Sequence, residues 1–140
     1  MGTPRTRGER YVPPEHPAAR AAYEAEFSYT VGLCHSYQHP EVVLVGGWEH
    51  ALPYLNVVGD LVKDGERFPP GSRTRKVLAG YEVRFDAVGE QARDLILTWA
   101  HWANDRMPFE AVQLVFPDTQ GRWPEDLGYH AFSQPLLLDE

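Results

Sequence analysis

The sequence predicts an α+β fold: an antiparallel or mixed sheet of about five strands, with two to three helices mainly on one face. Two observations lead to this class. Segments with strand and helix periodicity follow one another in the order α, β, β, α, β, α, β, without the repeated βαβ units that a doubly wound fold requires. The chain also has 140 residues, of which 43% are hydrophobic, so one domain can bury a substantial core.

The first half of this pattern begins after an irregular arm. Residues 1–17 combine Pro, Gly and Arg without periodicity, which predicts a flexible N-terminal arm before a single domain at 18–140. Residues 18–26 are rich in good helix formers and predict a short helix. Residues 27–33 alternate apolar and polar side chains, as a strand with one apolar face does.

A second strand is predicted directly after the first. Residues 42–45 are continuously apolar, which is typical of a strand buried on both faces. It can pair with the preceding strand as an antiparallel hairpin across a loop at 34–40. From about 50 to 64, apolar residues recur at helical spacing, and Pro53 is tolerated if it falls in the first turn. Residues 65–73, with two prolines and two glycines, predict a loop.

The second half of the chain repeats both kinds of element. Residues 81–87 alternate as a strand with one solvated face, and 90–105 show the clearest helical repeat in the chain. Residues 110–116 return to the strand pattern. Residues 117–132 are too rich in Pro, Gly and Asp for regular structure and predict an ordered loop. The segment 134–138 is expected to dock as a short edge segment of the sheet.

Charge and cysteine content exclude several classes of function. The net charge of −7 opposes nucleic acid and anionic membrane surfaces, so neither is an expected partner. The single cysteine cannot form an internal disulfide, and no apolar run resembles a signal peptide or reaches the roughly 20 residues of a membrane helix. These features predict a cytoplasmic protein, and they leave its oligomeric state open.

The link between the first two strands contains a possible metal site. His35 and His39 are four residues apart, and with Cys34 or Glu41 they provide the ligand types that zinc prefers. However, Pro40 and the flanking strands indicate a loop, where this spacing does not bring two side chains together as it does on a helix. We therefore expect neither a metal nor a cofactor, and the alternative is that His39 bonds the backbone of its own turn.

An acid–base pair is the second possibility in this region. His39 can exchange a proton near neutral pH, and Glu41 or Asp118 can act as its carboxylate partner. The candidate catalytic residues are therefore His39, Glu41 and Asp118. Each also has an ordinary structural interpretation, since a Glu that opens a strand is usually exposed and an Asp after Pro usually caps its own turn.

Four further residues are candidates for binding a substrate or ligand, namely Tyr29, Thr30, Gln113 and Trp123. Gln113 interrupts an apolar strand, so its amide must find partners in a structural network or in a ligand. Thr30 raises the same question on another strand. If the two strands adjoin, both residues can line one cleft, while Trp123 forms an aromatic wall over a ligand or seals the sheet.

Six motifs along the chain resemble one known family. They are "FSYTVGL", "HPEVVLVG", "VKDGERFPPG", "GYEVRF", "QLVFPDTQGRWPED" and "QPLL", and they span residues 27–138. In this order they resemble the bacterial DUF4262 family, a domain of unknown function common in actinobacteria. The resemblance implies no reaction. Family members usually carry a less reactive residue where this chain has Cys34. A weaker similarity to suppressor-of-fused-like domains indicates protein interaction.

These observations lead to one functional hypothesis and two alternatives. The leading hypothesis is a small cytoplasmic domain that binds a small molecule or a protein in a cleft formed by the "HPE" loop, residues 39–41, and the "PDTQGRW" loop, residues 117–123. The first alternative is a cofactor-independent enzyme, such as a hydrolase or isomerase, that transfers protons through His39. The second is an immunity-like or regulatory interaction module.

Overall fold

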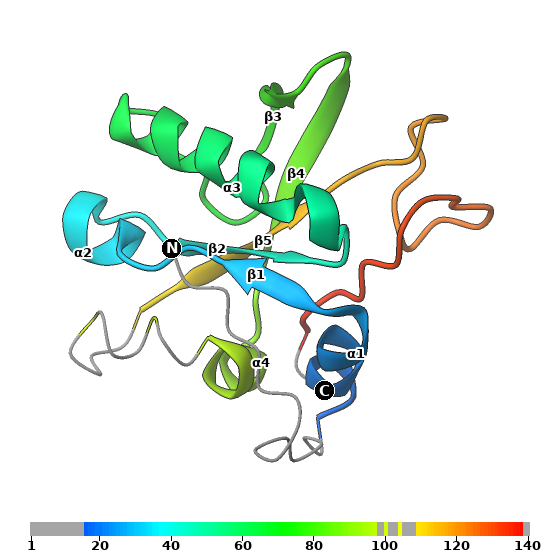
Figure 1. Cartoon of the computed structure of the whole chain (residues 1–140), viewed down its shortest axis with the longest axis horizontal. Helices are drawn as coiled ribbons and strands as arrows, with labels where there is room; N and C mark the ends of the chain where they lie inside the picture. The colour runs from blue at the N-terminus through cyan, green and yellow to red at the C-terminus, as the bar shows by residue number, and fades with distance from the viewer. Residues whose placement is uncertain (1–15, 98–99, 101–103, 105–108, 139–140) are drawn as a thin grey trace.

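The computed structural model describes residues 16–97, 100, 104 and 109–138. The arm expected at 1–17 lies outside this part of the chain except for its last two residues. Figure 1 shows a twisted sheet with helices above and below it. No helix in the described part of the chain is both long enough and apolar enough to cross a bilayer.

The sheet has five strands and is mixed, as the sequence predicts. Its spatial order is β1-β2-β5-β4-β3. The central pair β2–β5 is parallel, and the other three pairs are antiparallel. The hairpin expected between the first two strands is confirmed. The strands are β1 (Phe27–Tyr29), β2 (Glu41–Val45), β3 (Arg73–Leu78), β4 (Tyr81–Ala87) and β5 (Ala111–Val115).

Helices cover both faces of this sheet. They are α1 (Pro17–Ala25), α2 (Leu33–Tyr37), α3 (Trp48–Lys63) and α4 (Glu90–Ile96). α3 packs on one face through a cluster that contains Val42 and Leu114, whereas α1 and α4 pack on the other face through a cluster that contains Val43 and Ile96. Figure 1 shows α3 above the sheet and α1 with α4 below it. The fold is α+β, and the described residues contain four helices instead of two to three, which cover both faces.

The two central strands account for the apolar runs in the sequence. Every residue of β2 and β5 is buried, because each strand has a sheet neighbour on both edges and helices or the C-terminal segment above and below. Burying one Val or Leu side chain stabilises a fold by roughly 1.5–3 kcal/mol. The polar Glu41 and Gln113 within these strands are therefore exceptions that need partners.

Two elements were not expected from the sequence. Residues 33–37 form the one-turn helix α2, where we expected the end of a strand and the start of a loop. The first strand ends at Tyr29, and Gly32 then turns the chain with a φ of +112°. The edge strand β3 was also missed. It pairs with β4 through a tight turn at Gly80, and its register shifts between Thr74 and Leu78.

Two expected helices differ from the structure in their limits. α3 begins at Trp48, so Pro53 lies inside the helix. The sequence placed it in the first turn. The missing N–H of Pro53 leaves the carbonyl of the residue four positions earlier without its helical donor. α4 ends at Ile96, and the rest of the helix expected at 90–105 falls largely outside the described residues.

The C-terminal segment, residues 132–138, crosses the sheet instead of extending its edge. No strand is assigned within it, yet Leu137 is fully buried in the cluster beneath α1 and α4. The segment passes so close to the end of β2 that a Cβ atom built on Gly46 would lie 2.1 Å from the carbonyl oxygen of Ser133. The expected edge segment therefore docks on a face of the sheet.

Candidate functional site

Glu41 is the most completely bonded polar residue in this region. Its side chain is fully buried at the start of β2. The carboxylate accepts hydrogen bonds from the Thr30 hydroxyl at 2.8 Å and from the backbone N–H groups of Gly32, Leu33 and Cys34 at 3.0–3.2 Å. The three N–H groups belong to the turn into α2 and its first residues, which have no helical acceptors of their own. Glu41 therefore organises the chain reversal between β1 and α2.

The Thr30 hydroxyl completes the same network. It donates to Glu41 and accepts a hydrogen bond from the backbone N–H of Val42 at 2.9 Å. The backbone N–H of Thr30 in turn donates to the Val42 carbonyl at 2.9 Å. The structure thus brings together two of the candidate site residues, Thr30 and Glu41, but each uses its polar atoms to bond the other and the backbone.

His39 is held by the backbone on both sides of its ring. Nδ1 lies 2.7 Å from the carbonyl oxygen of Pro40, and Nε2 accepts the backbone N–H of Phe68 at 2.9 Å. This pattern requires a neutral ring with its proton on Nδ1. Burial lowers the pKa of His39 and the nearby Arg67 guanidinium lowers it further, against the opposing effects of the Pro40 carbonyl and the Glu41 carboxylate. The expected alternative, in which His39 bonds the backbone of its own turn, describes the Pro40 contact but not the bond from Phe68.

We expect acid to weaken the fold through His39. A second ring proton would sit on Nε2 and face the Phe68 N–H, so the folded state favours the neutral ring. Because the folded pKa lies below the unfolded value of about 6.5, the stabilisation is complete above that pH and is lost as the pH falls through the folded pKa. His39→Leu should cost about 1–3 kcal/mol at pH 7.5, and less at pH 5, in urea unfolding.

A matched variant separates this effect from general acid sensitivity. His35 is exposed on α2, so His35→Gln should change the free energy of unfolding by under about 0.5 kcal/mol at either pH. An equal pH response in wild type and His39→Leu would show that His39 is not the titrating group.

Asp118 organises the loop that follows β5. Its Oδ1 accepts the backbone N–H groups of Gln120 and Arg122, and its Oδ2 accepts the Arg122 guanidinium and the backbone N–H of His130, all at 2.8–3.0 Å. Burial favours the protonated carboxyl, but the bonds from Arg122, His130 and Gln120 outweigh it and hold the pKa of Asp118 well below its usual range. The turn-capping interpretation of Asp118 therefore extends to a whole loop.

The two loops expected to form one cleft lie far apart, and that part of the hypothesis is wrong. Glu41 pairs with Ala111 in the parallel β2–β5 ladder, so residues 39–41 lie at the start of both strands and residues 117–123 lie beyond their other end. Five strand residues span roughly 16 Å. Figure 1 shows α2 and the loop after β5 on opposite sides of the molecule. His39 and Asp118 therefore do not share a site.

Gln113 bonds the C-terminal segment. Its Nε2 donates to the Pro135 carbonyl and its Oε1 accepts the Leu137 N–H, both at 2.9 Å. Gln134, on the C-terminal segment, makes the reciprocal pair of bonds. Its side-chain amide accepts the Phe116 N–H and donates to the Phe116 carbonyl, both at 2.9 Å. Each side-chain amide thus bonds the opposing backbone as a neighbouring strand would. The structural-network interpretation of Gln113 describes this arrangement.

The remaining candidate residues are also placed by packing. Tyr29 is fully buried and shares a sheet face with Gln113, since both pair with Val43. Thr30 borders α3 on the other face, so Thr30 and Gln113 do not line one cleft. Trp123 is half-buried beside the β3–β4 hairpin. Among the described residues, no group of three or more His, Cys, Asp and Glu side chains is arranged to hold a metal ion.

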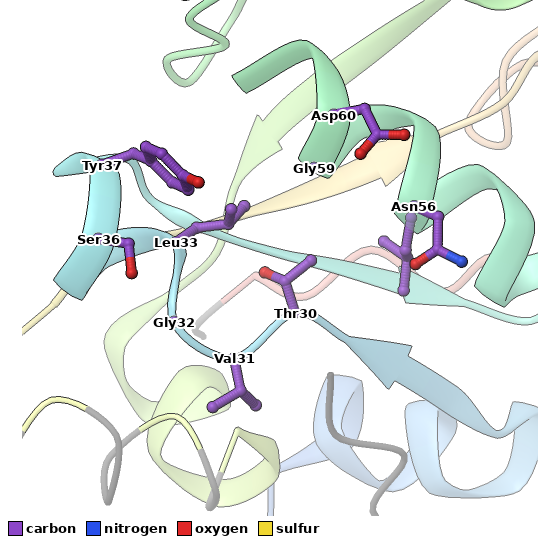
Figure 2. Close-up of a pocket in the computed structure, with 10 residues that line it drawn as sticks. Thr30, Val31, Gly32, Leu33, Ser36, Tyr37, Asn56, Gly59 and Asp60 are labelled. Atoms are coloured by element: carbon purple, nitrogen blue, oxygen red, sulfur yellow. The ribbon is translucent and has the colours of Figure 1, made fainter. Parts of the chain in front are cut away.

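A hollow of about 250 Å³ lies directly above the Glu41 network. We call it the α2–α3 hollow. Its floor is the turn at Thr30 and Gly32, one wall is α2, and the other wall is α3. Figure 2 shows the Tyr37 hydroxyl and the Asp60 carboxylate pointing into the space between the two helices. The polar side chains that line it beyond this floor are Ser36, Tyr37, Asn56 and Asp60.

These four side chains differ in one respect from the hydrogen-bonded candidates Thr30, His39, Glu41, Gln113 and Asp118. With the described residues, none of the four makes a side-chain hydrogen bond or ion pair. Sequence inspection missed them because they lie on exposed helix surfaces, where polar residues are ordinary. The one local signal is the spacing of Asn56 and Asp60, which places them on the same side of α3.

Fold and site together define a class: a small α+β domain whose first turn is built around a buried carboxylate. The family model of the "Domain of unknown function (DUF4262)" matches residues 11–130. The chain therefore belongs to the DUF4262 family, as its motifs suggested. Neither the curated proteins nor the solved structures contain a match to it.

Proposed function

We propose that this domain is a binding module whose ligand is a small, polar, positively charged molecule held in the α2–α3 hollow. One observation carries the proposal. Four polar side chains without partners among the described residues meet at this hollow, while the polar atoms of Glu41 and the ring nitrogens of His39 beside it are already hydrogen-bonded.

The charge of the hollow indicates the charge of the ligand. Asp60 is the one ionisable acid or base among its lining residues apart from the phenol of Tyr37. The Asp60 carboxylate has no ion-pair partner among the described residues, so it can attract an ammonium group. The Tyr37 ring adds an aromatic surface of the kind that binds cations. Ser36 and Asn56 offer a hydroxyl and an amide, which can orient a polar body. A compact amine satisfies all four groups.

The floor of the hollow is rigid before any ligand arrives. Glu41 fixes the backbone of Gly32, Leu33 and Cys34 through three hydrogen bonds. A preformed wall lowers the ordering cost of binding. In this proposal the buried carboxylate therefore supports the site from below instead of reacting in it.

The other two hypotheses have less support. An acid–base enzyme needs a ring nitrogen or carboxylate that is free to exchange a proton with a substrate. The ring nitrogens of His39 are bonded to the backbone, and the Asp118 carboxylate is bonded to Arg122 and to backbone N–H groups. A protein-interaction module needs a contiguous apolar patch. Among the described residues, the exposed large apolar side chains instead come from α3, α4, the loop after β5 and the C-terminal segment, with Leu127 the most exposed of them.

Titration of the ¹⁵N-labelled chain with 1,4-diaminobutane tests the proposal. We expect saturable shifts at the backbone amides of Gly32, Tyr37 and Gly59. Asp60→Asn should weaken this binding about tenfold, equivalent to roughly 1.4 kcal/mol. The neutral 1,4-butanediol and the anionic succinate have similar length and should not produce these shifts.

Asp64→Asn is the matched control. Asp64 is exposed at the end of the same helix and does not line the hollow, so its loss should change binding less than about twofold. An equal loss in both variants would indicate only nonspecific attraction to an acidic protein. Equal binding of the diol, or no saturable binding of the diamine, would also contradict the proposal.

A further inference from the structure

A second pair of hollows lies at the other end of the molecule, around the β3–β4 hairpin and the loop after β5. This loop is closed by Asp118 and places Trp123 beside the hairpin. The guanidinium carbon of Arg84 lies 4.8 Å from the Trp123 ring centroid, and that of Arg73 lies 5.3 Å from it. The aromatic ring is therefore bordered by two cations.

These two arginines differ in how many of their guanidinium donors already bond a carboxylate. Arg84 is buried and bonds both Asp86 and Glu125 through paired contacts at 2.6–3.1 Å, so its role is structural. Arg73 is half exposed and makes one long contact to Glu82, at 3.4 Å.

Among the three cations of β3, Arg75 has the most guanidinium or ammonium donors without a partner in the described residues. It is exposed and has no ion-pair partner within the described part of the chain. Lys76, the other cation on this strand, pairs with Glu66. Free guanidinium donors therefore remain at Arg75 and, in part, at Arg73.

Both arginines line a hollow of about 290 Å³, together with Tyr81, Glu82 and Trp123. A second hollow of about 440 Å³ adjoins it and is walled mainly by apolar groups, including Leu78 and Phe132. Tyr81 and Pro117 line both hollows. A cationic hollow and an apolar one are thus neighbours that share two lining residues.

We infer that this pair of hollows binds a small amphipathic anion, a molecule with a carboxylate or phosphate head and an apolar body. The head lies between Arg73 and Arg75, where planar guanidinium groups match its oxygens. The body passes Tyr81 and Pro117 and covers the apolar wall. This site is independent of the α2–α3 hollow, whose one charge is negative.

The acidic groups nearby do not cancel this attraction. Glu82 lines the cationic hollow and faces Arg73, and Asp86 and Glu125 both bond Arg84. Arg75 is therefore the lining cation that has no ion-pair partner among the described residues. Asp118 borders the apolar hollow, but its oxygens are occupied by Arg122, Gln120 and His130. In a chain with a net charge of −7, an anion is repelled from most of the surface and needs such a local exception.

Octanoate and octyl phosphate are the probes for the two possible heads. Titration of the ¹⁵N-labelled full chain should give saturable shifts at the amides of Arg75, Tyr81 and Ala131, and not at Gly32 or Tyr37. Shortening octanoate to hexanoate should weaken binding roughly tenfold if the two methylene groups are buried. The tighter of the two probes identifies the head. Octanol, which lacks the charge, should not bind.

Arg75→Gln is the decisive variant, because Arg75 is exposed and exposed substitutions should change stability by under about 0.5 kcal/mol. We expect a loss of affinity of at least about fivefold, and a further loss in 0.5 M NaCl because salt screens exposed charges. Lys63→Gln removes an exposed cation from α3 and should have no effect. Equal binding of octanol, equal loss in both variants, or no saturable binding of either anion would overturn the inference.

Discussion

Replacing Glu41 with Leu should lower the free energy of unfolding by roughly 3–5 kcal/mol. The reason lies in the donors that remain. Three of the four groups that bond the carboxylate are backbone N–H groups at Gly32, Leu33 and Cys34. They cannot be removed with it, and a leucine leaves them buried or partly buried without acceptors. Urea unfolding followed by circular dichroism measures the change.

Two further variants define the cause. Glu41→Gln keeps one acceptor oxygen and should cost about half as much. Glu110→Gln removes an exposed carboxylate immediately before β5 and should change stability by under about 0.5 kcal/mol. If Glu41→Leu unfolds within 1 kcal/mol of the wild type, on the scale of one ordinary hydrogen bond, the network does not hold the turn into α2.

Gly46→Ala should destabilise the fold by roughly 3 kcal/mol or more. Gly46 has a φ of +79°, and its new Cβ would lie 2.1 Å from the Ser133 carbonyl oxygen and 2.9 Å from a ring carbon of Phe132. Either the end of β2 or the C-terminal segment must move. We expect the Leu137 amide, which donates to Gln113, to exchange with solvent faster in the variant.

Gly59→Ala provides a control of opposite sign. Gly59 lies inside α3, and a Cβ there has no heavy atom within 4 Å. Alanine should therefore stabilise the helix by about 0.5–1 kcal/mol. Equal changes in the two variants would mean that the close approach at Gly46 has no energetic consequence.

Local patterns predicted the central part of the fold. The alternation at β1, the apolar run of β2 and the helical repeat of α3 each arise from neighbours within a few residues, so they are readable without tertiary structure. α2 is different, because a five-residue helix is too short to form from its own propensity. Its start depends on Glu41, which follows it in the chain. The strand β3 was not predicted, because it is mostly exposed and its register shift interrupts the alternation of apolar and polar residues.

The candidate residues were predicted less well than the fold. A polar residue inside an apolar strand correctly marked Gln113 as a group that needs partners. Glu41 was expected to be exposed in its ordinary structural interpretation, and it is instead fully buried. The partners of both residues include backbone atoms brought close only by folding, such as Pro135 and Leu137 beside Gln113. Local sequence cannot distinguish such a bond from a bond to a ligand. The α2–α3 hollow was missed for the complementary reason, since its residues look solvated until the two helices face each other.

The parallel pairing of β2 with β5 also has a consequence for synthesis. Residues 46–110 separate these neighbouring strands, so the centre of the sheet forms only after a long intervening segment has folded back. Such non-local pairing slows folding towards milliseconds or seconds. On the ribosome, β2 emerges long before β5 and keeps an apolar edge unpaired until then. We expect nascent chains of intermediate length to be the species most prone to aggregation and most dependent on chaperones.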